Sequence, residues 1–405
     1  MTVLADEKLA DICELVTDGT HDSPKLQAHG VPFIKGKHIN TGRIDFDSCD
    51  FITPDDHAKC IKRVKPQLND ILIANIGASI GDCARVTTDH EFSIKNVALL
   101  RPDANRIDPS YFYHFVKSSV FQGRLLNLRL GAAQPYVSLA AFRGFEVPVI
   151  SDRVLQRKIG EVFDAYEALI ENNRRRIELL EEAARLLYRE WFVHFRFPGH
   201  EHVKIIDGVP EGWEQKNFAD VCDTIGGGTP STKVPEYWAD ADVTWITPTD
   251  ITRNNCLALL DGEKKISQAG LKKSSAKLVP AYTILMTSRA SVGFFGIIDR
   301  EVCTNQGFIN IIPHEEVLRY YLLFNLIHRV EEIRAHAGGS TYAEISKSKF
   351  RALPVTIPTN ELLEDFDERI RPILDQVRCL KKQMESLAQA RDLLLPRLMD
   401  GRLGV

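Results

Sequence analysis

Apolar residues recur at alternating steps of four and three positions along residues 153–192, with polar residues between them. This spacing is typical of the seam of a coiled coil and is narrower than the apolar stripe of an ordinary surface helix. It therefore predicts one long helix whose seam is covered by a second helix. The seam positions are Ile159, Phe163, Tyr166, Ile170, Asn173, Ile177, Leu180, Ala184, Leu187 and Trp191.

The same pattern returns near the C-terminus in the same phase, with each position 207 residues after its counterpart. These positions are Phe366, Ile370, Ile373, Val377, Leu380, Met384, Leu387 and Leu394, with Arg391 in the break. Both helices are about 35–40 residues long, against a mean of about 11–12 residues in globular proteins. Since the chain must return, the two helices would pair most simply as an antiparallel coiled coil, with Asn173 fixing the register.

Shorter matches precede both helices in the same order, at offsets between 206 and 212 residues. They pair Ala10 to Cys13 with Ala219 to Cys222, Gly19-Thr20 with Gly228-Thr229, Val31 to Ile34 with Val243 to Ile246, Ala78 to Gly81 with Ala290 to Gly293, and Tyr136 with Tyr342. Offsets that drift by a few residues indicate small loop insertions within two copies of one fold. The sequence therefore predicts an internal pseudo-two-fold repeat.

Each copy is predicted to be a mixed α/β (α+β) domain. Short apolar runs of strand length lie at 70–75 and 97–100 in the first copy and at 283–287 and 308–312 in the second. Asp108 and Pro109 have the residue types of an N-cap and a first helical position, which predicts a helix over 109–128 with a counterpart over 315–334. The resulting division is a first domain at 1–150, a first long helix at 151–197, a second domain at 198–358, and a second long helix with a C-terminal tail at 359–405.

Composition narrows the classes of partner. The formal net charge of −4 over 405 residues excludes a general polyanion binder, so a nucleic-acid surface would have to be local or completed by a partner. The eight cysteines form no C-x-x-C pair, which favours reduced thiols in a cytoplasmic protein. No run approaches the ~20 apolar residues of a membrane span.

Val209 to Glu214 leads into the second copy, and Leu394 to Gly401 ends the second helix. Over essentially the full length of the chain, the order of these parts resembles that of the specificity (S) subunit of a type I restriction-modification system. The resemblance implies two target recognition domains, each reading one half of a split DNA site. It implies that the long helices separate these domains and dock two methyltransferase (M) subunits, with restriction/translocase (R) subunits joining through the complex. It also implies no catalysis by this chain, since S-adenosylmethionine, ATP and Mg are expected on the partner subunits.

The residues agree with the absence of catalytic and metal sites. Asp108 to Tyr111 differs from the D-P-P-Y motif of amino-methyltransferases at its third position, and the helix-cap interpretation is favoured. Gly226 to Lys233 is glycine-rich but lacks the G-K-[ST] ending of a phosphate loop. The twelve histidines form no ligand constellation.

The candidate DNA-binding residues are side chains with paired donors and acceptors, which read base edges, and cations, which bind phosphates. They fall in matched loops of both copies, although each alone fits an ordinary solvated turn. The first copy offers Thr20, His21, Ser23, Lys25, Lys35, Lys37, His38, Asn40, Asn75, Ser79, Lys95, Asn96, Gln134 and Tyr136. The second offers Thr229, Ser231, Thr232, Lys233, Thr247, Thr249, Arg253, Asn254, Ser288, Arg289, Ser291, Asn305, Gln306, Ser340, Thr341 and Tyr342.

Because these loops differ between the copies, the recognised site is expected to be asymmetric and interrupted, with a gap set by helix length. The alternative hypothesis is a coiled-coil scaffold or adaptor that binds only proteins. It predicts no sequence-selective retention of DNA.

Overall fold

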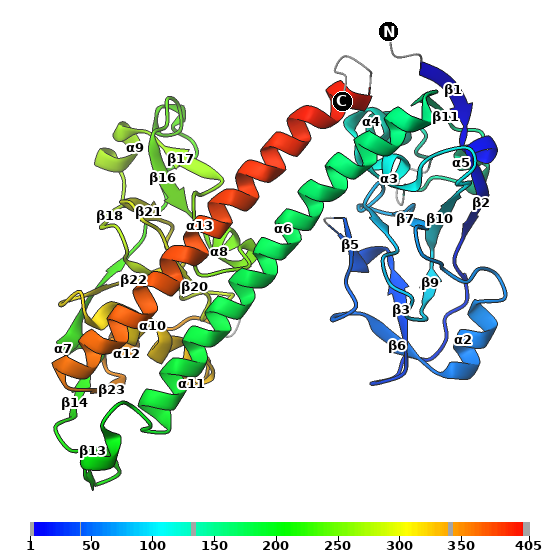
Figure 1. Cartoon of the computed structure of the whole chain (residues 1–405). Coiled ribbons are helices and arrows are strands. Elements are labelled where there is room, and N and C mark those ends of the chain that lie inside the picture. The colour runs from blue at the N-terminus through cyan, green and yellow to red at the C-terminus, as the bar shows by residue number, and fades with distance from the viewer. Residues whose placement is uncertain (1–3, 41, 131–134, 339–342, 400–405) are drawn as a thin grey trace. The chain divides into compact units, whose positions relative to one another are not determined.

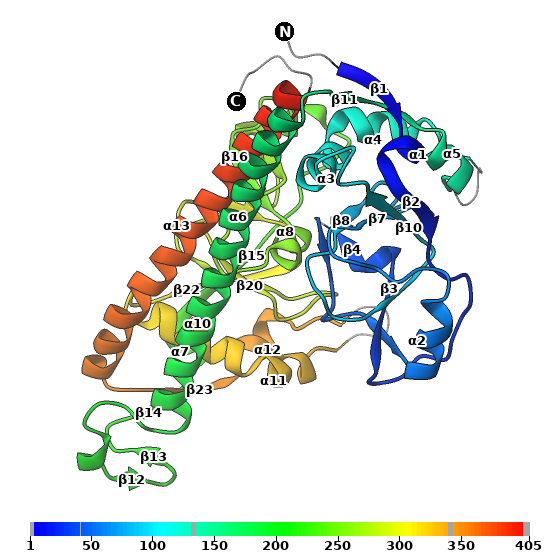
Figure 2. The ribbon, with the colours of Figure 1, turned by 45° about the vertical axis from the view of Figure 1, so that its right-hand side comes forward.

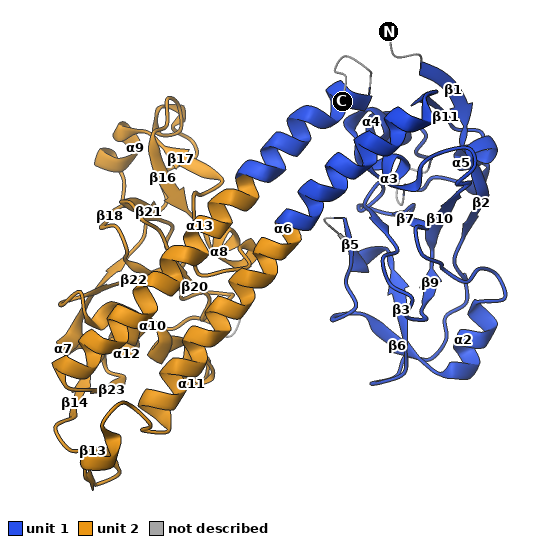
Figure 3. Cartoon of the chain, in the orientation of Figure 1, with its two compact units in different colours: residues 1–169, 386–405 blue, residues 170–385 orange. Residues whose placement is uncertain are grey.

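The computed structural model describes residues 4–40, 42–130, 135–338 and 343–399 (Figure 1). The chain divides into two compact units, residues 1–169 with 386–405 and residues 170–385 (Figure 3). The long helices α6 (Arg153–Tyr188) and α13 (Asn360–Met399) each contribute a segment to both units. Each unit therefore holds one globular head, at residues 4–150 or 214–357, and a stretch of both helices.

The first head is built on an antiparallel sheet in the order β2-β10-β7-β8. Its central strands are buried throughout or nearly so, because their sequences are continuous apolar runs. A second sheet has the order β6-β3-β9, with β3 parallel to β9. The strands are β1 (Leu4–Lys8), β2 (Cys13–Asp18), β3 (Val31–Lys35), β4 (Ile39–Asn40), β5 (Arg43–Ile44), β6 (Asp50–Ile52), β7 (Ile71–Ala74), β8 (Cys83–Arg85), β9 (Ser93–Lys95), β10 (Val97–Pro102) and β11 (Glu146–Ile150).

Helices cover one end of this first head. The helices are α1 (Leu9–Ile12), the 3-10 turn η1 (Gly36–His38), α2 (Pro54–Cys60), α3 (Pro109–Lys117), α4 (Ser119–Leu126) and α5 (Leu139–Arg143). Figure 2 shows α3 and α4 between the main sheet and α6, and their aromatic residues form one core with Ile159 and Phe163 of α6. The first head is thus fastened to the long helix by a shared hydrophobic core.

The predicted helix over 109–128 is two helices, because Ser118 ends one and begins the next. The backbone of Ser118 is extended, and its hydroxyl accepts a hydrogen bond from the Phe121 N–H while donating one to the Phe115 carbonyl. The predicted helix over 315–334 is likewise α10 (Leu318–His328) and α11 (Val330–Ala335). The expected N-cap is confirmed, since the Asp108 side chain accepts from the Tyr111 N–H at 3.0 Å.

The second head repeats the topology of the first. Its main sheet has the order β15-β22-β19-β20, and its second sheet, β17-β16-β21-β18, again contains one parallel pair. The strands are β14 (Glu214–Asn217), β15 (Cys222–Gly226), β16 (Val243–Ile246), β17 (Lys264–Ile266), β18 (Leu278–Val279), β19 (Ile284–Thr287), β20 (Phe295–Ile297), β21 (Val302–Thr304), β22 (Phe308–Pro313) and β23 (Pro354–Ile357). The predicted internal repeat of mixed helix and strand is confirmed.

The remaining elements of the second unit are short. They are the π-helical turn η2 (Arg189–Val193), η3 (His200–His202), the hairpin β12 (Ile205–Ile206) and β13 (Val209–Pro210), α7 (Phe218–Val221), η4 (Pro235–Tyr237), α8 (Pro248–Arg253), α9 (Gln268–Lys273) and α12 (Lys347–Arg351).

Two of the sequence matches require correction. In the first copy, Pro102 pairs with Cys13 and Arg101 with Leu15, so a bulge inserts one residue into β2 that β15 lacks. The Thr20 N–H donates to the Ile94 carbonyl of β9, and the Gly228 N–H donates to the Thr304 carbonyl of β21. Because β9 and β21 are the corresponding strands of the two parallel pairs, the structural equivalent of Thr20 beyond the bulge is Gly228 rather than Thr229. Tyr136 bridges two loops as Glu344 does in the second copy, so Glu344 is its equivalent rather than Tyr342.

The two long helices pair in antiparallel fashion within each unit. In the second unit Ile177 packs with Val377 and Leu380, and in the first unit Glu167 binds Arg391 at 2.8 Å. Every predicted seam position along α6 and α13 is buried or half-buried. The coiled-coil pattern is therefore confirmed in register and direction.

Candidate nucleic-acid interface

The ends of three strands bring the first group of candidate residues together in the first head. Thr20 forms a parallel bridge with Lys95, and Lys95 pairs with Lys35 where β9 runs beside β3. Across these ends, His21 Nδ1 lies 2.9 Å from Asn96 Oδ1, and the Lys95 amine donates to the Ser23 hydroxyl. Loops far apart in the sequence thus form one continuous polar edge.

A second loop group joins this edge through η1. The Val137 N–H donates to the carbonyl of Asn75 at 2.9 Å, and Ile76 bridges Tyr136. A Cβ atom on Gly36 would stand 3.5 Å from the Ser79 hydroxyl, so η1 packs directly on the loop after β7. The candidate residues of the first head therefore lie in adjoining loops.

The second head gathers its candidates in the same way. The Asn305 N–H donates to the Ile246 carbonyl at 2.9 Å, and the Thr229 hydroxyl donates to Gln306. The Ser288 N–H binds the Gly307 carbonyl at 2.8 Å, and Arg289 bridges Glu344. The loops after β15, β16, β19 and β21 therefore meet as their counterparts do in the first head.

Several candidate side chains build these loops rather than project from them. Thr20, His38, Asn75 and Ser288 are buried. Burial and the neighbouring Lys37 lower the pKa of His38, which favours its neutral form.

Three further candidates in the second head are bound to their own loops. The backbone N–H and the hydroxyl of Thr247 both donate to the Asp250 carboxylate at the start of α8. The Asn254 amide donates to the Cys256 and Ala258 carbonyls, and the Asn305 Oδ1 atom accepts from the Gly307 N–H. These residues fix the shape of the candidate surface.

The other candidates are exposed or half-exposed, and two of the arginine ion pairs in the second head are long. Arg289 lies 3.7 Å from Glu344 and Arg253 lies 3.8 Å from Glu263. Such exposed pairs contribute little to stability, so their cations can exchange a carboxylate for a phosphate at low cost. The group comprises His21, Ser23, Lys25, Lys35, Lys37, Ser79, Lys95, Asn96, Tyr136, Thr229, Ser231, Thr232, Lys233, Thr249, Arg253, Arg289, Ser291 and Gln306.

Gln134, Ser340, Thr341 and Tyr342 lie outside the described residues, as does the side chain of Asn40. Whether any candidate side chain contacts DNA stays a prediction.

Sequence reasoning missed a cationic group beside the first loop of each head. Thr53 caps α2 and Ser267 caps α9, and each short helix ends among lysines. In the first head Arg63 donates to the backbone and side chain of Asp18, two residues before Thr20. The lysines and arginines concerned are Lys59, Lys62, Arg63, Lys272, Lys273 and Lys277.

In the second head the segment after α9 packs closely against the loop after β15 through the backbone. A Cβ atom on Gly228 would overlap the Ser275 carbonyl oxygen, so the chain after α9 lies against the loop after β15. The sequence signal for these lysines is a capping Thr53 or Ser267 followed within a few residues by lysines, one in each copy.

The described residues hold neither a metal site nor a membrane-spanning helix. Over that part of the chain, no group of three or more His, Cys, Asp or Glu side chains is arranged to hold a metal ion. No helix there has both the length and the apolar content needed to cross a bilayer. All eight cysteines are free, and only Cys379 is exposed.

Comparison with known proteins gives a consistent set of relatives. The domain family described as "Type I restriction modification DNA specificity domain" matches the chain twice, over residues 5–182 and 210–387. Each match covers one head and most of the helix that follows it.

Individual relatives agree with the family match. The chain is 34% identical over 199 residues to the type I restriction enzyme MjaIX specificity subunit of Methanocaldococcus jannaschii, covering 49% of this chain and 46% of that relative, so it aligns with about half of that protein. It is 22% identical over 421 residues to the putative MjaX specificity subunit of the same organism, covering 98% and 93%. The crystal structure of a type I restriction-modification S subunit from M. genitalium has the same fold, with a TM-score of 0.62 at 15% identity over 98% of this chain and 96% of that one.

Proposed function

Because this chain belongs to the type I restriction modification DNA specificity family, we propose that it reads a bipartite DNA site, one half with each head. Its homologues are named specificity subunits, the non-catalytic DNA-recognition components of such systems. The observation that carries the proposal is the repeated polar edge, where equivalent strand ends in both heads gather side chains of the types that read bases and bind phosphates in other proteins.

The two heads present different elements at this edge, which supports an asymmetric site. Between the paired strands the first head places η1 and the β4–β5 turn, with Lys35 and Lys37. The second head places α8 there, with Thr249 and Arg253. Because donors and acceptors differ in kind and position, the two half-sites would differ in sequence.

Exposed apolar residues on the long helices support docking of partner subunits. Leu179 and Leu186 stand seven residues apart on α6 with 62% and 46% of their surface exposed, and Leu393 on α13 is 66% exposed. Large apolar side chains among charged neighbours are typical of protein interfaces. We assign these helices to two methyltransferase subunits, which would carry S-adenosylmethionine, while restriction subunits with ATP and Mg join through them in the cytoplasm.

The chain has a net charge of −4, so it would bind the negatively charged DNA weakly on its own. We expect tight binding only in the complex with the methyltransferase subunits. The helices would also set the gap between the half-sites, because a heptad adds about 10.5 Å at ~1.5 Å per residue.

The experiment that tests the proposal profiles DNA methylation in cells that carry this chain with its methyltransferase partner. The expected result is one interrupted, asymmetric motif that disappears when this chain is deleted. Removing residues 170–176 together with 381–387 takes one heptad from each helix and should shorten the gap. Methylation that persists without the chain, or a motif with an unchanged gap, would contradict the respective part of the proposal.

A further inference from the structure

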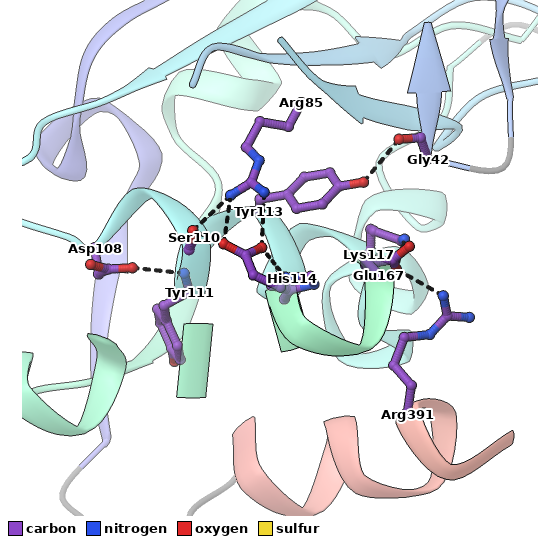
Figure 4. A network of polar contacts seen from close by, with 11 residues as sticks. Gly42, Arg85, Asp108, Ser110, Tyr111, Tyr113, His114, Lys117, Glu167 and Arg391 are labelled. Carbon is purple, nitrogen blue, oxygen red and sulfur yellow. Dashed lines mark hydrogen bonds and ion pairs between the residues drawn. The ribbon is translucent and has the colours of Figure 1, made fainter. Parts of the chain in front are cut away.

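A row of charged side chains in the first unit connects the helix pair to the β4–β5 turn. Arg391 of α13 donates to Glu167 of α6 at 2.8 Å, and Glu167 accepts from Lys117 of α3 at 2.7 Å (Figure 4). Lys117 in turn lies against Gly42, in the turn between β4 and β5. Four elements that are distant in the sequence thus meet through three side chains.

The turn is held by two side chains of α3. The Tyr113 hydroxyl donates to the Gly42 carbonyl at 3.0 Å, and the Lys117 amine lies 5.3 Å from the centre of the Tyr113 ring (Figure 4). A Cβ atom at Gly42 would come within 2.9 Å of both the Lys117 amine and the Tyr113 hydroxyl, and its φ of +84° favours glycine. The position of Gly42 is therefore set by Tyr113 and Lys117.

Glu167 is the acceptor that holds this row together. The side chains of Lys117, Glu167 and Arg391 are 17%, 28% and 19% exposed, so water screens them little. Burial alone would raise the pKa of Glu167, but Lys117 and Arg391 together hold it below its ordinary value. Without this carboxylate, two half-buried cations would face each other with no partner between them.

Among the described residues of the second unit, the two positions that correspond to Glu167 and Arg391 carry no charge. At the repeat offset of 207 residues, Glu167 corresponds to Leu374, and Arg391 corresponds to Ala184. Both Leu374 and Ala184 are buried. Leu374 lines a small apolar cavity of about 10 Å³ with Ile297 and Tyr320. At these two positions the second unit has apolar side chains where the first unit has charged ones.

We infer that Glu167 is a positioning residue for DNA reading by the first head, because it fixes the β4–β5 turn relative to the helix pair through Lys117. This inference rests on the proposed function. The turn continues the segment with Lys35 and Lys37, which belongs to the candidate edge. Displacement of the turn by even an ångström would misalign that segment with the base edges, since direct readout depends on bidentate geometry.

The test uses the full chain assembled with its methyltransferase partner and carrying Glu167→Gln. Methylation rates are measured on duplexes with the intact motif and with one base-pair change in either half-site. We expect discrimination to fall about tenfold, or about 1.4 kcal/mol, at one half-site and to stay unchanged at the other. Tyr113→Phe, which removes only the hydroxyl bound to Gly42, should weaken discrimination at the same half-site.

Two controls separate positioning from general damage. Glu182→Gln makes the same charge change at an exposed position of α6, and Leu374→Met alters the equivalent site of the second unit; both should leave the first head's half-site unaffected. Equal losses at both half-sites in Glu167→Gln, or no loss at either, would overturn the inference. A wild-type complex that discriminates neither half-site would instead refute the proposed function.

Discussion

Asn173 of α6 donates a hydrogen bond from Nδ2 to Oε1 of Gln383 on α13, at 3.3 Å. It is buried at a seam position, and the seam positions on either side of it are Ile170 and Ile177. A polar residue at one seam position specifies register and costs stability. The bond to Gln383 joins the two helices at this position.

Asn173→Leu should therefore stabilise the second unit by about 1–2 kcal/mol, the gain from burying an aliphatic side chain. Urea unfolding followed by far-UV circular dichroism measures the change, with Glu182→Leu at an exposed position as the control. A lower urea midpoint in Asn173→Leu would contradict the assignment of Asn173 to the seam.

Arg289→Ala should relax reading at one base pair of the second head's half-site, at a cost of about 1–3 kcal/mol in binding. Arg289 is half-exposed in the loop after β19, and its side chain forms a long ion pair with Glu344. Arg300→Ala is the control, because Arg300 is also exposed and ion-paired but follows the end of β20 that is opposite to the loop after β19. Binding of the assembled complex to a panel of single-substituted duplexes measures both variants, and an unaltered profile in Arg289→Ala removes Arg289 from the interface.

Leu179→Glu combined with Leu186→Glu should abolish copurification with the methyltransferase subunit. Both side chains are exposed, so the free energy of unfolding should change by only about 0.5 kcal/mol. Arg176→Glu, an exposed residue of the same helix, makes the same total change in charge and should retain the partner. Retention of the partner by the double leucine variant would place docking elsewhere.

The first unit should lose stability as the pH falls from 7. Burial lowers the pKa of His114 from 6.5, although its bond to Asp164 opposes this shift (Figure 4). The folded state therefore takes up this proton less readily than the unfolded chain, so stability is complete above pH 6.5 and declines below it.

Asp164 adds a second decline at lower pH. Burial would raise its pKa, but bonds from His114, Arg85 and Ser110 hold it well below 3.8, so its contribution is present above pH 3.8 and is lost as the pH falls further. His114→Gln keeps an amide donor for Asp164 without a titrating group. Urea midpoints at pH 7.5 and 5.5 should differ less in His114→Gln than in the wild type, and equal differences would contradict the assignment.

The features that sequence predicted best are those with long periods. The heptad seams run from Ile159 to Trp191 and from Phe366 to Leu394, so a few exceptions such as Asn173 and Arg391 did not obscure them. Shorter features failed where one side chain decided the outcome. Ser118 splits a helix by bonding to its own backbone, and a single inserted residue in β2 shifted the match of Thr20 by one position.

The candidate site was predictable only as a set of loops. Sequence cannot distinguish a side chain that caps a helix, such as Thr247, from one that projects outward, such as Thr249, because that depends on backbone conformation. The charged row through Glu167 was missed for a related reason. On the heptad pattern Glu167 lies beside the seam and reads as solvated, and only the fold brings Lys117 and Arg391 to it.

The first unit is assembled from the two ends of the chain. Leu395, Leu398 and Met399 of α13 complete the core that contains Ile159 and Phe163 of α6. During synthesis the first head leaves the ribosome early, yet the residues that close its core appear only after residues 170–385 have been made, about 10–40 s later at ~5–20 residues per second. The core of the first head is therefore completed last, and until then the apolar side chains of α6 that Leu395 and Leu398 cover lack that cover.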